Sequence, residues 1–341
     1  MPMLLSVSLL MKVEKLLPES DALKIVLVYY AVAAIIVLGA YISPAQGELA
    51  TNTPILLSIL LLIPICLWQR NYRKETKLPR VIGGKDKETV LFWIFVLFAL
   101  ALSVRIPSAL LFGEPYEKMP LIYLLILTIL VIEKTDIAAF GFKTGNLGKS
   151  LGSGMAFWAI LGGLTLSIQY IMIWGFTGQV PLQSYGVTLP LLAMPFMTLC
   201  VGISEEGLFR GYMQSHLGKL YTSRQAILVQ AILFGGWHFV WNLYPFDPWN
   251  MAQYVATTFL IGLVFGYFYS KTNNLVPLVL AHGLWNSVPL GIVENGTVMS
   301  HFWTFPFPHQ MLVLVLPFTV SALSAVLFIK YLVRKVQPQE H

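Results

Sequence analysis

The sequence predicts an all-α protein, a polytopic bundle of about 8–10 transmembrane helices, and two observations support this fold class. Hydrophobic residues make up 57% of the 341 residues and charged residues only 11%, with a mean hydropathy of +0.72. A soluble globular domain carries about 25% charged residues. The apolar runs are also continuous, whereas the strands of a membrane β-barrel alternate apolar and polar residues. The chain therefore reads as a helical, multi-pass membrane protein.

The apolar runs place the individual helices. A membrane span needs about 20 consecutive apolar residues, or fewer where flanking residues snorkel. On this criterion we expect a short surface-lying helix at 1–17 and spans near 22–42, 54–68, 89–111, 119–132, 151–176, 188–215, 225–243, 251–270, 275–293 and 311–333. The segments 54–68 and 119–132 are short and contain prolines, so re-entrant segments are an alternative there.

The charges in the loops predict the orientation of the chain. Lys and Arg gather in alternate loops, above all in the loop 69–88, while the opposite side keeps Lys118 and acidic residues such as Glu117 and Asp247. Basic residues stay on the cytoplasmic side of a membrane, so both termini are predicted to be cytoplasmic. The net charge of +6 is then a signal of topology and gives no indication of nucleic-acid binding.

The segment Val201–Gly211 is unusual because it brings charges into a predicted span. It contains Glu205, Glu206 and Arg210. Ionisable groups at membrane depth are costly unless they pair or face water, which makes them candidates for function. Glu206 and Arg210 are four residues apart and share one helix face, where they can form an ion pair. Glu205 points about 100° away and is available to another group.

Two later spans also carry polar side chains. Phe234-Gly-Gly-Trp-His238 lies in one, and the glycines beside His238 allow another helix or a substrate backbone to approach closely. His282-Gly-Leu-Trp-Asn286 lies in the other, with His282 and Asn286 on one face. No span in 22–176 has a comparable cluster. Because buried polar groups must satisfy one another, we expect the three segments to converge on one cavity within the C-terminal helices.

The residue types indicate the chemistry of this cavity. One carboxylate can accept a proton from water, a histidine can position that water, and a His–Asn pair can stabilise an oxyanion. The other ionisable residues have simpler interpretations. Arg105 and Glu133 lie at predicted span ends, where snorkelling explains them, and His216 reads as part of a solvated helix end. The residues alone thus predict a membrane-embedded hydrolase.

The three motifs also resemble a known family. Glu205-Glu206-x-x-x-Arg210, Phe234-x-x-x-His238 and His282-x-x-x-Asn286 are similar, in order and spacing, to those of the CPBP/ABI family of intramembrane proteases. That family includes the type II CAAX prenyl endopeptidases and bacteriocin-processing or self-immunity proteins. The resemblance divides the chain into an N-terminal transmembrane region (1–187), a CAAX-protease-like catalytic core (188–293) and an outer loop, last span and cytoplasmic tail (294–341).

The resemblance implies roles for six residues. Glu205 and His238 would activate the attacking water, and His282 and Asn286 would form the oxyanion site. Glu206 and Arg210 would support the first motif, with Phe234 as a packing residue. The implied activity is endopeptidase cleavage of a peptide or protein substrate at the lipid membrane, either a prenylated CAAX-type peptide or a bacteriocin-like one. In CAAX processing the protein loses its last three residues.

A metal ion is the alternative cofactor prediction. Glu205, His238 and His282 could supply three ligands with water as the fourth, which is the count of a catalytic zinc site. The chain has no His-Glu-x-x-His pair. Members of the family have been described both as metalloproteases and as glutamate-dependent enzymes. We favour the metal-independent form, because Asn286 beside His282 suits an oxyanion donor better than the second shell of a metal.

Two other functions compete with proteolysis. A proton-coupled transporter would also bury Glu, Arg and His, but it predicts inverted repeats between the halves of the chain, and none is evident. A non-proteolytic scaffold or immunity protein could keep the fold. Such a protein has no need of the full set Glu205, His238, His282 and Asn286, so the hydrolase is the better interpretation.

Overall fold

The computed structural model describes residues 21–42, 53–178, 193–293 and 306–336. All regular elements in these ranges are helices, with no strand among them. The all-α fold class predicted from the apolar runs is therefore confirmed. The predicted surface helix at 1–17 lies outside the described residues, and so do residues 294–305 of the predicted outer loop.

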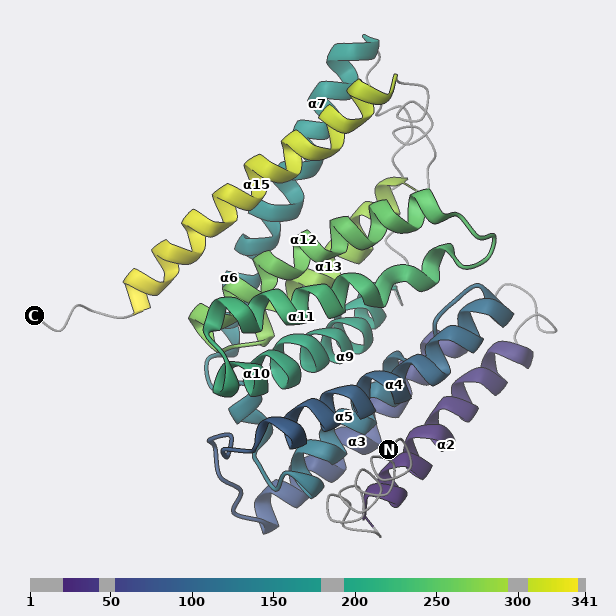
Figure 1. The fold of residues 1–341 in the computed structure, drawn as a ribbon, viewed down its shortest axis with the longest axis vertical. Helices are drawn as coiled ribbons and strands as arrows, with labels where there is room; N and C mark the ends of the chain where they lie inside the picture. The colour runs from purple at the N-terminus through teal and green to yellow at the C-terminus, as the bar shows by residue number, and fades with distance from the viewer. Residues whose placement is uncertain (1–20, 43–52, 179–192, 294–305, 337–341) are drawn as a thin grey trace, which may run out of the picture.

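The N-terminal helices form one side of the bundle (Figure 1). They are α2 (Asp21–Ile42), α3 (Thr53–Glu75), α4 (Lys87–Phe112) and α5 (Lys118–Leu127), which a π-helical turn extends to Ile132. Two tyrosines tie them together. Tyr29 on α2 donates a hydrogen bond to the Leu100 carbonyl of α4 (2.8 Å), and Tyr123 on α5 donates one to the Leu61 carbonyl of α3 (2.8 Å).

The opposite side consists of two long, crossing helical rods (Figure 1). One is α6 (Leu147–Trp158), continued by the π-helical stretch η4 (Ala159–Gly163) and by α7 (Leu164–Thr177). The other is α15 (Phe307–Val336), which packs along α7. Gln169 of α7 donates a hydrogen bond to the Val313 carbonyl of α15 (3.3 Å).

Between the two sides runs the helical segment that contains Glu205 and Glu206. It is built from α8 (Ala193–Pro195), η5 (Phe196–Gly202), α9 (Ile203–Glu206), η6 (Gly207–Gln214) and α10 (Ser215–Leu220). The η5 and η6 stretches are π-helical, a geometry that is rare and frequent at functional sites. α9 contacts α5 on one side and α13 on the other, so the pair of carboxylates lies at the centre of the molecule.

His238 lies in the turn between two helices that form a hairpin. α11 (Ser223–Trp237) begins at a capping box made by Thr222 and Gln225, and it ends in the 3₁₀ turn η7 (His238–Asn242). α12 (Pro248–Thr272) returns alongside, capped by Asp247. A Cβ atom at Gly235 would lie 2.8 Å from the Val255 carbonyl oxygen of α12, which confirms that this glycine permits a close helix contact.

Glycines also allow close packing of α13 (Val276–Val293), the helix that carries His282. A Cβ atom at Gly154 of α6 would lie 2.5 Å from the Pro277 carbonyl oxygen, and one at Gly202 would lie 2.6 Å from the Val279 carbonyl oxygen. A Cβ atom at Gly283 would lie 2.5 Å from the Thr198 Cα atom. α13 is therefore held backbone-to-backbone between α6 and η5, which fixes the position of His282.

Six helices of the described residues are long and apolar enough to cross a membrane. They are Asp21–Ile42, Thr53–Glu75, Lys87–Phe112, Leu147–Phe176, Pro248–Thr272 and Met311–Arg334. The chain is thus an integral, multi-pass membrane protein. Residues 54–68 belong to the full-length helix α3, whereas Lys118–Ile132 is a shorter apolar helix. The cytoplasmic location of both termini stays a prediction.

Three ionisable residues depart from the sequence-based interpretation. Arg105 is fully buried and does not snorkel, and His216 is 2% exposed and does not lie at a solvated helix end. The His216 ring lies 3.0 Å from a carboxylate oxygen of Glu133, which also accepts a hydrogen bond from Tyr212 (2.6 Å) and pairs with Lys85 (2.9 Å). These predictions were wrong because the partners come from other parts of the chain, which a single segment cannot reveal.

The glycine contact at 283 leads to the first prediction. Gly283→Ala should destabilise the protein by about 1–3 kcal/mol, because the added methyl group collides with the backbone of Thr198. The measurement is thermal unfolding of the purified protein in mild detergent. Gly152→Ala is the matched control, since Gly152 is an exposed helix position with nothing within 4 Å of its Cβ, and alanine there favours the helix. Equal melting temperatures for the two variants would contradict the proposed contact.

Candidate active site

Glu206 anchors the first motif. It is fully buried, and its Oε1 atom accepts a hydrogen bond from Arg210 Nη1 (3.0 Å), so the predicted ion pair is present. The same oxygen lies 2.7 Å from His282 Nδ1 on α13. Because a carboxylate can only accept, the His282 Nδ1–H group donates this hydrogen bond. Glu206 thereby links Arg210 to His282 and fixes which edge of that imidazole faces Glu205.

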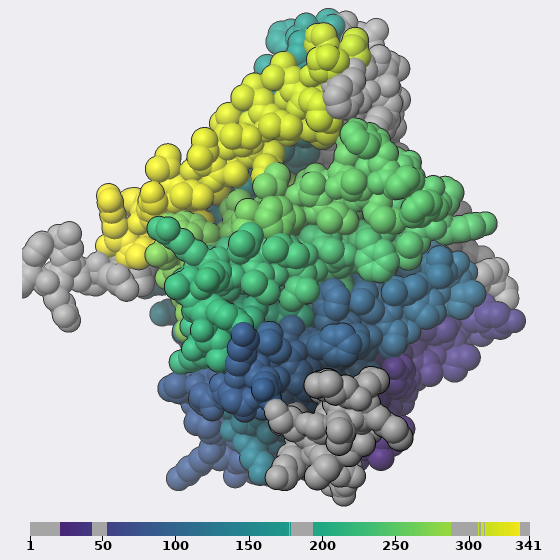
Figure 2. Space-filling model, viewed as in Figure 1, coloured from purple at the N-terminus to yellow at the C-terminus, as the bar shows by residue number. Residues whose placement is uncertain are grey.

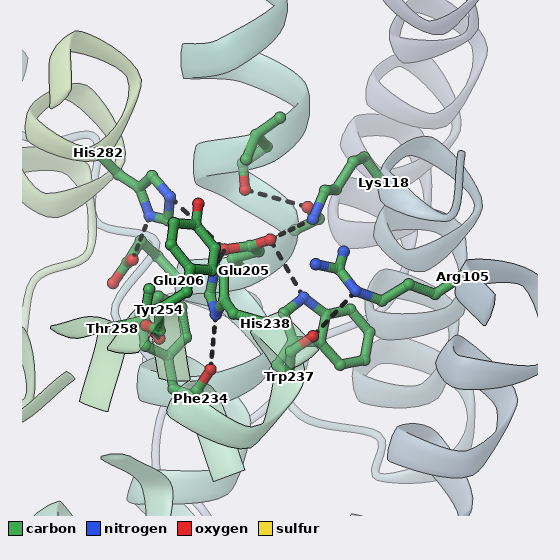
Figure 3. Close-up of polar contacts among 12 residues, drawn as sticks. Arg105, Lys118, Glu205, Glu206, Phe234, Trp237, His238, Tyr254, Thr258 and His282 are labelled. Carbon is green, nitrogen blue, oxygen red and sulfur yellow. Dashed lines mark hydrogen bonds and ion pairs between the residues drawn. The ribbon is translucent and has the colours of Figure 1, made fainter. Parts of the chain in front are cut away.

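Glu205 occupies the centre of the site (Figure 3). Its two carboxylate oxygens have different surroundings. Oε1 contacts the ammonium group of Lys118 and accepts a hydrogen bond from the Trp237 indole (3.2 Å). Oε2 lies 3.8 Å from His238 Nε2 and 3.5 Å from His282 Nε2. One oxygen is therefore held by donors, and the other faces both histidines.

His238 is oriented by its own helix. Its Nδ1 atom lies 2.7 Å from the Phe234 carbonyl oxygen, which can only accept, so Nδ1–H donates and Nε2 of the neutral ring is an acceptor. The Phe234 ring packs against His238 with the ring centres 4.7 Å apart, and the Arg210 guanidinium lies 4.1 Å from the Phe234 ring centre. Phe234 is thus a packing residue, as the second motif predicts.

Glu205 Oε2 and His238 Nε2 are both acceptors, and they lie 3.8 Å apart. A water molecule, which can donate two hydrogen bonds, complements such a pair. The pair also offers a carboxylate that can take a proton from that water. The convergence of the three motifs expected from the sequence is found, and its geometry suits the activation of water.

Asn286 is less closely integrated. It lies on α13 one turn beyond His282 and is partly buried, and it makes no hydrogen bond to any of the described residues. Its amide is a candidate donor to a bound substrate.

The electrostatic surroundings of Glu205 bear on whether a metal fits. Three cations and three carboxylates, each at most 5% exposed, form one cluster: Arg105, Lys118, Arg210, Glu117, Glu205 and Glu206. The ammonium of Lys118 already neutralises Glu205, so a divalent metal would add two charges to a balanced, buried cluster. No group of three or more His, Cys, Asp or Glu in the described part of the chain meets metal-binding geometry. The metal-independent form stays a prediction.

The sequence-based analysis missed several residues of this site. Lys118, Glu117 and Arg105 come from α4, α5 and the turn between them, and Trp237 precedes His238. The expectation that no span in 22–176 has a comparable cluster overlooked these residues, which reach the site from separate helices. A signal existed for Arg105, because an arginine within an apolar span is a functional candidate by default. Lys118 and Glu117 looked like loop charges and gave no such signal.

Fold and site together define a multi-pass membrane protein with a buried set of residues suited to hydrolysis. Comparison of the sequence with protein families agrees: residues 187–288 match the model described as type II CAAX prenyl endopeptidase Rce1-like. Over these residues the chain resembles a domain of this membrane protease family, which acts on peptides or proteins. Arg105, Glu117 and Lys118 lie outside the matched residues. No curated protein and no solved structure matches the chain.

The buried ion pair leads to the second prediction. Arg210→Met should destabilise the protein by about 3–5 kcal/mol, because it leaves the Glu206 carboxylate buried without its cation. The loss of unfolding free energy in the double variant Glu206→Gln/Arg210→Met should be clearly smaller than the sum of the losses in the two single variants. Unfolding by denaturing detergent measures this double-mutant cycle. The exposed pair Asp21–Lys24 provides the control, where Lys24→Met should cost under about 1 kcal/mol. Additive losses at 206 and 210 would contradict the coupling.

Proposed function

We propose that the protein is an intramembrane endopeptidase that cleaves a peptide bond of a membrane-associated, prenylated CAAX-type substrate by using water activated by glutamate and histidine. The observation that supports this most is the placement of Glu205 Oε2 within 3.8 Å of His238 Nε2 and 3.5 Å of His282 Nε2, deep inside a helical membrane protein. The family match at residues 187–288 supports the substrate class.

In the proposed reaction, Glu205 takes a proton from water while His238 Nε2 orients that water. The water oxygen forms a bond to the carbonyl carbon of the substrate, and the carbonyl oxygen becomes an oxyanion. His282 in its protonated form, whose charge Glu206 balances through the 2.7 Å hydrogen bond, donates Nε2–H to the oxyanion together with the Asn286 amide. Glu205 then passes its proton to the leaving nitrogen, and the C–N bond breaks to give a carboxylic acid and an amine. The acid loses its proton to the amine, which leaves a carboxylate and an ammonium group.

The role of Glu206 in this scheme is electrostatic. Its carboxylate accepts hydrogen bonds from both Arg210 and His282, so it can balance a positive charge that develops on the His282 ring. The pair Glu206–His282 thus resembles in its logic the carboxylate that orients a catalytic histidine in serine hydrolases. The scaffold interpretation gives no reason for a histidine held in this way.

The third prediction concerns activity. Purified wild-type protein should cleave a prenylated CAAX-type peptide, and Glu205→Gln and His238→Ala should each lower kcat/KM by at least about 1,000-fold. Asn286→Ala should lower it by about 100-fold, the usual cost of losing one oxyanion donor. His309→Ala, which removes an exposed histidine of α15, should leave the activity unchanged. Mass spectrometry of the products measures cleavage, and an active Glu205→Gln variant would disprove the assignment.

The choice of peptide separates the substrate classes. Three peptides of equal length are compared: a prenylated CAAX-type peptide, its unprenylated form and a bacteriocin-leader peptide. We expect cleavage of the prenylated peptide three residues from its end. Cleavage of the bacteriocin-like peptide alone would support the endopeptidase activity and overturn the specificity for CAAX-type peptides.

The fourth prediction concerns metal dependence. Because the cluster around Glu205 is already charge-balanced, extensive dialysis against a chelator should leave kcat/KM unchanged, and added Zn²⁺ should not raise it. Elemental analysis of the active protein should find much less than one zinc per chain. Loss of activity on chelation, restored by Zn²⁺, would instead support a site formed by Glu205, His238 and His282.

A further inference from the structure

A closed ring of buried contacts joins the catalytic helix to the N-terminal helices. It starts at Glu205 Oε1, passes through Lys118 to Glu117 and on to Arg105, and returns through Trp237 to the same carboxylate oxygen. The members come from α4, the start of α5, α9 and the end of α11. In Figure 3, Lys118 and Arg105 approach Glu205 from one side, while His238 and His282 lie on the other.

The contacts of the ring are short and shielded from solvent. Lys118 Nζ contacts Glu205 Oε1 and lies 2.8 Å from Glu117 Oε1, and Arg105 Nη1 contacts the same Glu117 oxygen. Arg105 Nε donates a hydrogen bond to the Trp237 carbonyl (3.1 Å), and its guanidinium lies 4.4 Å from the centre of the Trp237 ring. All five residues are at most 5% exposed.

The ring controls two groups that the proposed reaction needs. At Glu205 it supplies two donors to Oε1, so the remaining oxygen, Oε2, is the one directed at the histidines. At α11 it holds the Trp237 carbonyl, which belongs to the peptide unit immediately before His238 and lies where the helix tightens into a 3₁₀ turn. A carbonyl at a helix end lacks its usual intrahelical partner, and Arg105 supplies one.

We propose that Lys118, supported by Glu117 and Arg105, is a positioning residue of the active site, which keeps Glu205 ionised and its Oε2 atom directed at the attacking water. This inference rests on the proposed function. It assigns to the N-terminal region, outside the family match at 187–288, a direct part in building the site. On the face drawn in Figure 2, the blue region around α4 packs directly against the green helices of the C-terminal part.

The physical reason is the cost of a buried charge. An isolated carboxylate in an apolar interior takes up a proton rather than stay ionised, and a protonated carboxyl group cannot serve as a general base. Arg210 cannot replace Lys118, because its guanidinium is hydrogen-bonded to Glu206. Lys118 is the cation in direct contact with Glu205, so losing it should impair the chemical step and leave substrate binding largely intact.

The first test separates kcat from KM. Lys118→Met keeps the length of the side chain and removes its charge, and it should lower kcat by at least about 100-fold with KM changed less than about threefold. Lys149→Met, at an exposed position of α6, is the matched control and should behave like the wild type. A Lys118→Met variant with normal kcat would overturn the proposal, whereas a wild type that cleaves no peptide would overturn the proposed function instead.

A chemical rescue excludes a merely structural role. In Lys118→Ala, a small alkylamine such as propylamine should restore at least about a tenth of the lost kcat, because its ammonium group can occupy the space of the lysine head group. Propanol, of similar size but uncharged, should not rescue, and propylamine should not rescue Glu205→Gln. Rescue by both additives, or by neither in a variant that melts like the wild type, would count against a positioning charge.

Infrared spectroscopy gives a reading that needs no substrate. Subtracting the spectrum of Glu205→Gln from that of the wild type isolates the Glu205 band, which should be that of an ionised carboxylate. The same subtraction in the Lys118→Met background should show a protonated carboxyl group. Thermal unfolding reports whether each variant is folded. Glu117→Gln serves as a second, milder variant, in which a smaller fraction of Glu205 should be protonated than in the Lys118→Met background. An ionised Glu205 in the Lys118→Met background would refute the inference.

Discussion

The cost of keeping carboxylates ionised inside an apolar helix bundle governs the arrangement of this protein. Glu205 and Glu206 are adjacent in sequence and buried, so each needs a compensating cation within contact distance. Arg210 can serve Glu206 from the same helix, one turn away. Glu205 points in another direction, and its cation, Lys118, comes from a different part of the chain. The central helix is therefore stable only when helices from both sides of the bundle enclose it.

The packing of the helices is adapted to that requirement. Glycines at 202 and 283 let α13 approach η5 to backbone contact distance, which places His282 beside the Glu205 carboxylate, and Gly235 lets α11 pack closely against α12 next to His238. Larger side chains at these contacts would separate the helices, and the interactions among the charged groups depend on distances below 4 Å. The π-helical stretches on both sides of α9 change the direction in which successive side chains point, as is common where a helix carries a functional site.

The sequence alone predicts the fold class and the core of the site, because both depend on local patterns. Apolar runs define the spans, and a spacing of four residues places Glu206 with Arg210 on one helix face. Long-range partners are different. Lys118 lies 87 positions from Glu205 in the sequence. It stands beside a loop, so on sequence alone it counts among the loop charges that set the orientation of the chain in the membrane. Arg105 and His216 looked like residues at helix ends for the same reason. Nothing in a single segment shows which distant helix will cover it, so these contacts emerge only from the structure.

The ring around Glu205 also explains how one set of cations can serve the whole proposed reaction. When water attacks, the negative charge leaves the Glu205 carboxylate and reappears on the substrate oxyanion at the same centre. Lys118 and Arg105 are held by Glu117 and Trp237 and do not need to move, so the field that stabilised the carboxylate also acts on the oxyanion. Preorganised charges of this kind stabilise a transition state without reorganisation. Of the three cations in the cluster, only Arg210 lies within residues 187–288. The motif-bearing helices by themselves would thus hold two carboxylates and one cation, and the N-terminal helices supply the positive charge that completes the site.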